Sequence, residues 1–215
     1  DPYVFFGTVL AETLTATGVK VEGGAAVTDT APGGLREIAR HETDLARTIQ
    51  VCLNVSQNFY AEMILRTLAH KVKGLGSREN GLEVVREFLK KVGLEQTVPT
   101  DGSGLSSDNR MTTADTVKLL RHMSAHAHAK TFIESLSSNG GETGTLRKRM
   151  KAKDVIGKVR AKTGHLDNVS ALAGYLEGGT GEVFAFAICV NDWKSGSPDG
   201  FQNRLCEFLI RYRGE

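Results

Sequence analysis

The chain has 215 residues, of which 40% are hydrophobic and 24% are charged, which is an ordinary globular composition for one domain or one domain with a small annex. Its formal net charge of +2 is too small to indicate a basic surface that binds nucleic acid or an anionic membrane. A basic cluster at 147–153 is interpreted as a solvated helix end or loop. No run approaches the roughly 18 apolar residues of a membrane span, and the longest, at 183–190, has the length of a strand.

The first half of the chain is predicted to be mainly helical. A helix over about 5–16 stops at Gly18, and glycines and a proline then mark a loop or hairpin up to about residue 34. A second helix is predicted from Thr43, as its N-cap, to Asn54. The clearest helix begins near Asn58, where apolar side chains recur at helical spacing.

Two more helices flank a turn-rich segment. One is predicted over 79–92, and the other over 113–123 with Thr112 or Thr113 as its N-cap. The segment 99–110 between them is rich in turn-forming residues and is expected to be an ordered loop.

The pattern changes near residue 155. Three strands are predicted at 158–163, 169–176 and 182–190, joined by glycine-containing turns. A helix over 201–212 follows, and Phe201, Leu205, Phe208 and Leu209 form its predicted apolar face. Helices followed by an antiparallel meander and a covering helix indicate an α+β fold.

Three cysteines, Cys52, Cys189 and Cys206, are scattered along the chain. They lack Cys-x-x-Cys spacing, and their number is odd. Buried free thiols are therefore predicted in preference to a zinc site or a disulfide framework.

The tripeptide Lys162-Thr163-Gly164 closes a predicted strand. On an edge strand beside a cleft, it would supply an ammonium group and a hydroxyl for a substrate carboxylate, and the glycine would allow close backbone approach. The tripeptide has little specificity by itself. An exposed strand lysine followed by an ordinary strand threonine is an equal alternative.

Ser-x-Asn occurs three times, and about one occurrence is expected by chance. Ser56-Gln57-Asn58 lies at the start of the clearest helix, where its polar side chains can face a cleft, although helix N-capping is the commonest role for a serine there. Ser107-Asp108-Asn109 lies in the turn-rich loop. Ser137-Ser138-Asn139 precedes two glycines, which is typical of a plain turn.

Four blocks in a fixed order carry a family resemblance. They are Ser56-Gln57-Asn58 continuing into Phe59-Tyr60-Ala61-Glu62, residues 101–106 with Arg110-Met111-Thr112, Gly144-Thr145-Leu146-Arg147 with Arg149, and Lys162-Thr163-Gly164. Together they resemble the low-molecular-mass class C penicillin-binding proteins, the D-alanyl-D-alanine carboxypeptidase/endopeptidases of the bacterial cell envelope. The similarity runs through most of the chain, and four ordered blocks are far more specific than one.

The resemblance implies a serine β-lactamase/DD-peptidase-like fold. The helical part then covers about 43–150, and the antiparallel sheet with its C-terminal helix covers about 155–215. All 215 residues are expected to form the C-terminal segment of a single DD-peptidase (transpeptidase-like) domain, whose N-terminal part is absent from this sequence.

The resemblance also assigns roles to site residues. Ser56 and Asn58 match the second motif of the family, and Lys162-Thr163-Gly164 matches the third. Ser56 would relay a proton to the leaving amine, and Asn58 would hold the substrate amide. Lys162 would support proton transfer and, with Thr163, bind the terminal carboxylate, beside a backbone that Gly164 leaves accessible.

Other positions near these motifs have two interpretations. His165 stands where the family usually has a smaller residue; its backbone N–H would stabilise the oxyanion, and a catalytic imidazole is the less favoured alternative. Asp101, Ser103 and Ser106 are expected to brace a loop near the site, and substrate contact is the alternative. Glu62 is expected to serve in packing and ion pairing.

No serine in the chain has a lysine three residues later, although the family mechanism begins with Ser-x-x-Lys. The resemblance implies that this motif lies on an N-terminal segment or another chain, and that the isolated chain is inactive. The complete enzyme would cleave peptidoglycan stem peptides ending in D-Ala-D-Ala through an acyl-enzyme, without a metal or organic cofactor, in the periplasm or another extracytoplasmic space. β-Lactams would bind as substrate mimics.

Two other functions are compatible with the same motifs. One is a non-catalytic peptidoglycan-binding pseudoenzyme, and the other is a β-lactamase or esterase of the same fold.

Overall fold

The computed structural model describes residues 1–30 and 33–213, which fall into two compact units, 1–42 and 43–215. In the first unit, α1 (Pro2–Ala16) begins at Asp1, whose carboxylate accepts hydrogen bonds from the backbone N–H groups of Tyr3 and Val4. This helix was predicted, and it stops just before Gly18 as expected. The assignment of all 215 residues to one domain stays a prediction.

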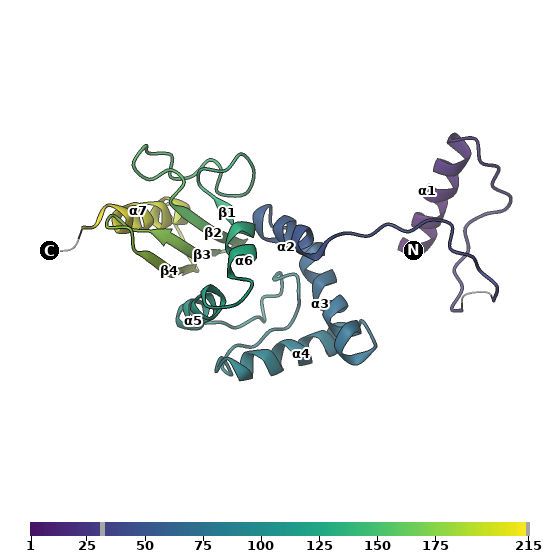
Figure 1. Ribbon diagram of the computed structural model, residues 1–215, viewed down its shortest axis with the longest axis horizontal. Helices are drawn as coiled ribbons and strands as arrows, with labels where there is room; N and C mark the ends of the chain where they lie inside the picture. Colours follow the sequence, from purple (N-terminus) through teal and green to yellow (C-terminus); the bar gives the residue numbers. More distant parts are fainter. Residues whose placement is uncertain (31–32, 214–215) are drawn as a thin grey trace. The chain divides into compact units, whose positions relative to one another are not determined.

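The second unit begins with five helices (Figure 1). They are α2 (Leu45–Asn54), α3 (Asn58–Lys73), α4 (Arg78–Lys91), α5 (Thr113–Ser124) and α6 (Ala129–Ser135). The first four were predicted, but the N-cap of α2 is Asp44 rather than Thr43, because the Asp44 carboxylate accepts from the N–H of Arg47. Thr112 caps α5. The seven-residue α6 was not predicted.

The sheet contains four antiparallel strands in the order β1-β2-β3-β4. They are β1 (Ser137–Ser138), β2 (Val159–Leu166), β3 (Val169–Glu177) and β4 (Val183–Asn191), and the last helix is α7 (Pro198–Arg211). The three predicted strands correspond to β2, β3 and β4 within a few residues. The α+β fold prediction is therefore confirmed.

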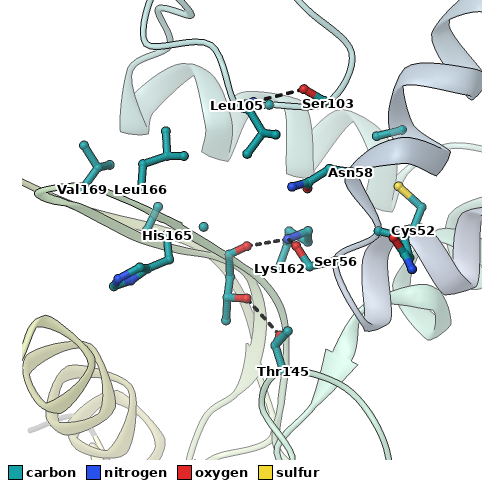
Figure 2. A pocket seen from close by; sticks show the side chains of 16 residues that line it. Cys52, Ser56, Asn58, Ser103, Leu105, Thr145, Lys162, His165, Leu166 and Val169 are labelled. Atoms are coloured by element: carbon teal, nitrogen blue, oxygen red, sulfur yellow. Dashed lines mark hydrogen bonds between the residues drawn. The ribbon is translucent and has the colours of Figure 1, made fainter. Parts of the chain in front are cut away.

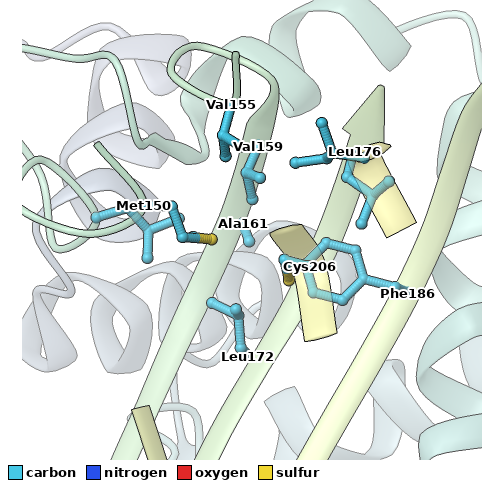
Figure 3. Close-up of a cluster of buried hydrophobic side chains, with 10 residues drawn as sticks. Met150, Val155, Val159, Ala161, Leu172, Leu176, Phe186 and Cys206 are labelled. Atoms are coloured by element: carbon cyan, nitrogen blue, oxygen red, sulfur yellow. The ribbon is translucent and has the colours of Figure 1, made fainter. Parts of the chain in front are cut away.

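The two faces of the sheet bury separate apolar clusters. One cluster joins β2 and β3 to α7 (Figure 3), and the other joins β3 to α5. Leu176 and Tyr175 are neighbours in β3 but belong to different clusters, because successive strand side chains point to opposite faces. The Tyr175 hydroxyl also donates to the carbonyl of Leu120 at 2.6 Å, which ties α5 to the sheet.

The buried face of α7 differs from the prediction. Gln202, Cys206 and Ile210 are buried, whereas Phe201 and Phe208 are exposed. A polar Gln202 can be buried because its amide donates to the Ser170 hydroxyl and accepts from the Arg149 guanidinium.

All three cysteines are free, as predicted. Only Cys206 is buried, however, because Cys189 lies exposed on β4 and Cys52 is half-buried on α2.

The turn predicted from Ser137-Ser138-Asn139 and the two glycines that follow is present at Asn139-Gly140, where the N–H of Gly141 donates to the carbonyl of Ser138 at 3.2 Å, but a strand before it was not predicted. The two serines form β1, and the fully buried Asn139 side chain holds the chain around it. Its amide donates to the carbonyls of Met150 and Val155 at 3.0 and 3.1 Å, and its oxygen accepts from the N–H groups of Gly157 and Val159 at 3.0 Å each. Asn139 therefore ties β1 to the irregular segment that leads into β2.

Across the described residues 1–30 and 33–213, none of the helices is both long enough and apolar enough to traverse a lipid bilayer.

Candidate active site

A cavity of about 530 Å³ lies where the junction of α2 and α3, the loop after α4, and strands β2 and β3 meet (Figure 2). Every predicted site residue except Asp101 and Ser106 lines it. The lining residues include Cys52, Ser56, Asn58, Ser103, Leu105, Thr145, Lys162, Thr163, Gly164, His165, Leu166 and Val169. The fold therefore gathers polar groups that are about a hundred positions apart in the sequence.

Ser56 occupies the junction between α2 and α3 in a left-handed conformation, with φ of +64°. Such a conformation costs a non-glycine residue about 1–3 kcal/mol and is often found at functional sites. The N-cap position of α3 is taken by Gln57, so the alternative interpretation of Ser56 as the helix cap is wrong. Its hydroxyl instead faces Lys162, whose Nζ donates to Ser56 Oγ at 2.7 Å.

The Lys162 side chain extends from β2 into the cavity and is partly buried. Its ammonium donates to Ser56 Oγ and to the carbonyl of Thr163. None of the ion pairs found in the described part of the chain involves Lys162. Burial lowers the pKa of Lys162, and the nearby Cys52 thiol acts in the opposite direction. The group can therefore act as an anion-binding cation or as a participant in proton transfer.

Asn58 is the first residue of α3, and its amide points into the cavity in Figure 2. Across the cavity on β2, the Thr163 hydroxyl lies 2.9 Å from the Thr145 hydroxyl. The imidazole of His165 is exposed and points away from Lys162 and Ser56 in Figure 2. This orientation favours a backbone contribution from His165 over a catalytic imidazole.

Asp101 braces the loop that forms one wall of the cavity. Its carboxylate accepts from the Ser103 hydroxyl at 2.7 Å and from the side-chain amide of Asn109 at 2.8 Å. It also accepts from the backbone N–H groups of Gly104, Leu105 and Ser106 at 3.1 Å each. Ser103 lines the cavity, whereas Ser106 lines a neighbouring cavity.

The pKa of Asp101 is predicted to govern the order of this loop in acid. Burial by itself would raise the pKa of Asp101. The hydrogen bonds from Asn109, Ser103 and the loop backbone together have the larger effect, and they lower this pKa from 3.8 to about 2. Because the pKa of Asp101 is lower in the folded chain than in the unfolded chain, its carboxylate stabilises the loop fully above pH 3.8. This stabilisation is lost as the pH falls toward 2. We expect the amide proton shifts of Gly104 and Ser106 to titrate with a midpoint near 2 in NMR spectra. A midpoint near the ordinary value would contradict the bracing role.

The same loop is fastened to α3 by Glu62. The Glu62 carboxylate accepts from the N–H of Gly102 at 2.9 Å and pairs with Arg66 and Arg78. A Cβ at Gly102 would lie 2.8 Å from Cβ of Leu65, so only glycine allows the loop to approach the helix this closely. The predicted ion-pairing role of Glu62 is confirmed.

Five further residues line the cavity although no sequence pattern predicts a role there for them: Cys52, Leu105, Thr145, Leu166 and Val169. Cys52 lies on α2, four residues before Ser56, and burial raises the pKa of its thiol. Thr145 belongs to the block Gly144-Thr145-Leu146-Arg147, and the match of this block to the family was the indication in the sequence that Thr145 could lie near the site. In the described ranges 1–30 and 33–213, no group of three or more His, Cys, Asp or Glu side chains is arranged to hold a metal ion.

A Ser-x-Asn motif facing a Lys-Thr-Gly strand across a cavity matches two of the three motifs shared by penicillin-binding proteins and serine β-lactamases. Residues 1–210 match the model of the D-Ala-D-Ala carboxypeptidase 3 (S13) family, and the chain belongs to this family. The family resemblance predicted from the motifs is thus confirmed.

Individual relatives agree with this assignment. The chain is 32% identical over 228 residues to a D-alanyl-D-alanine carboxypeptidase of Actinomadura sp., covering 100% of this chain and 41% of the relative. It is 30% identical over 185 residues to carboxypeptidase DacB of Mycolicibacterium smegmatis, covering 82% and 40%. The chain therefore spans about two fifths of the length of these relatives.

The fold is similar to that of penicillin binding protein 4 (dacB) from Haemophilus influenzae in complex with a β-lactam. The TM-score is 0.80 at 24% identity, covering 95% of this chain and 50% of that chain. At this identity the likeness supports the fold, including the sheet with its C-terminal helix.

Proposed function

We propose that this chain supplies the proton-relay and carboxylate-binding half of a serine-type D-Ala-D-Ala carboxypeptidase/endopeptidase. The observation that carries the proposal is the 2.7 Å contact between Lys162 Nζ and Ser56 Oγ, in a cavity that Asn58 and Thr163 also line. A serine hydroxyl, a partly buried ammonium and an amide are the groups that an acyl transfer needs around its leaving amine and its substrate.

The nucleophile is proposed to come from a Ser-x-x-Lys motif on a segment outside these 215 residues. Its serine oxygen attacks the carbonyl carbon of the penultimate D-alanine, and the C–N bond to the terminal D-alanine breaks. Ser56 passes the serine proton to the departing amine, which leaves as free D-alanine in the carboxypeptidase reaction. Water then hydrolyses the serine ester and restores the hydroxyl.

The Lys162 ammonium has two functions in this scheme. It donates to Ser56, which orients the hydroxyl and favours proton release from it. Its positive charge also attracts the terminal carboxylate of the substrate toward β2, where Thr163 provides a hydroxyl. Partial burial of the ammonium strengthens both effects, because electrostatic interactions are screened less where a charge is shielded from water.

The substrate backbone is proposed to lie between the α3 junction and β2. The Asn58 amide has both a donor and an acceptor for a peptide group, and it points into the cavity. The backbone N–H of His165 is proposed to complete an oxyanion hole together with that of the nucleophile, and a donor of this kind typically contributes about 3–4 kcal/mol.

The proposed substrate is a peptidoglycan stem peptide ending in D-Ala-D-Ala, and the proposed inhibitors are β-lactams, which present an amide and a carboxylate in a similar arrangement. Such a substrate places the reaction in the periplasm or another extracytoplasmic compartment.

The test is covalent labelling of the full-length gene product with a fluorescent penicillin. We expect a labelled band that disappears after preincubation with unlabelled benzylpenicillin, and no label on the 215-residue chain alone. Binding of cell-wall peptide without any labelling would identify a pseudoenzyme. Rapid turnover of penicillin would identify a β-lactamase.

A further inference from the structure

Two hydroxyl groups lie together at the β2 wall of the cavity. The Thr163 hydroxyl donates to Thr145 Oγ1 at 2.9 Å, and both residues line the cavity (Figure 2). Thr145 belongs to the irregular segment after β1, which is separated from β2 in the sequence, so this contact is produced by the tertiary fold.

The backbone around Thr145 is held on both sides. The Thr145 N–H donates to the carbonyl of Asn54 at the end of α2 at 3.2 Å, and the N–H of Leu146 donates to Ser137 Oγ at 2.8 Å. Leu146 is fully buried in the core. A Cβ at Gly144 would lie 2.4 Å from Ser137 Oγ, so the segment packs against β1 as closely as glycine allows. The position of the Thr145 hydroxyl is therefore determined by the fold.

A carboxylate has only acceptor atoms, so a hydroxyl can bind it only by donating its single proton. In the structure the Thr163 proton is donated to Thr145. When Thr163 turns this proton toward a carboxylate, its oxygen becomes free to accept, and the Thr145 hydroxyl can rotate to donate in return. Consecutive hydrogen bonds polarise one another, which strengthens the final bond to the charged group.

We infer that Thr145 is a positioning residue of the carboxylate subsite, acting through Thr163 as the second hydroxyl of a Thr145–Thr163–carboxylate relay. The inference rests on the proposed function and extends it to substrate specificity. Thr145 selects ligands with a free carboxylate over their neutral esters, because a charged acceptor gains more from a polarised donor than a neutral one does.

The test compares acylation of the full-length protein by benzylpenicillin and by its methyl ester. The quantity measured is the ratio of the two second-order rate constants. Thr145→Val keeps the side-chain shape but removes the hydroxyl, and we expect it to lower this ratio by roughly 3- to 10-fold. Thr145→Ser restores the hydroxyl, and we expect a ratio close to that of the wild type.

Thr143→Val is the matched control, because it makes the same change two residues away in a side chain that contacts Asn54 and does not line the cavity. A ratio in Thr145→Val that changes no more than in Thr143→Val would overturn the inference and leave the proposed function intact. Failure of the wild-type protein to react with benzylpenicillin would instead overturn the proposed function, and this inference with it. Equal loss in Thr145→Ser and Thr145→Val would also overturn the hydroxyl relay.

Discussion

Lys162→Ala is expected to lower the rate of acylation by a fluorescent penicillin by about 10²–10³-fold in the full-length protein, the usual effect of removing one preorganised electrostatic group from an acyl-transfer site. The variant removes the ammonium that donates to Ser56 Oγ and the cation that faces the ligand carboxylate. The measurement is the time course of covalent labelling, followed by in-gel fluorescence at several penicillin concentrations.

Two further variants separate charge from geometry. Lys162→Arg retains a positive charge but replaces the compact ammonium by a planar guanidinium, so we expect partial activity between that of the wild type and Lys162→Ala. Lys148→Ala removes an exposed lysine outside the cavity and is expected to leave labelling unchanged. An effect of Lys162→Ala no larger than that of Lys148→Ala would exclude Lys162 from the chemistry.

Asn139→Ala is expected to lower the free energy of unfolding of the 215-residue chain by about 3–5 kcal/mol. The substitution removes four hydrogen bonds, three of them buried, and leaves two carbonyls and two N–H groups without their side-chain partner. Each unsatisfied buried polar group is costly because water does not reach it. Urea denaturation followed by circular dichroism measures the change.

The control for this prediction is Asn80→Ala. The Asn80 side chain makes a single exposed hydrogen bond to the carbonyl of Leu75, so its removal is expected to change stability by less than about 1 kcal/mol. If the two variants were equally stable, Asn139 would not be the link that holds β1 to the segment before β2.

Hydrophobic periodicity predicted the helices and strands well, because it is a local property of the chain. The apolar spacing after Asn58 and the alternating or continuous apolar runs near β3 and β4 each contain enough residues to define a period. The seven residues of α6 and the two of β1 are too few for this. The two residues of β1 form a strand only because β2 pairs with them.

The motif blocks identify the family from the sequence alone, because four short motifs in one fixed order rarely occur together by chance. They did not identify Thr145 or Cys52 as cavity residues, because neither residue type has a specific role by spacing alone. The local rule for Ser56 predicted a helix cap, whereas the fold gives it a left-handed conformation and a contact with Lys162.

By itself, the sequence determined the longer helices and strands, the family and the residue types available for chemistry, all of which depend on neighbouring positions or on the order of short motifs. Only the tertiary structure decided which polar groups meet. Ser56 and Lys162 are 106 positions apart, and Asn139 is surrounded by residues up to 20 positions away. The partners of a polar side chain are set by how distant segments pack, so local composition predicted the turn at Asn139 but not the buried hydrogen bonds of its side chain.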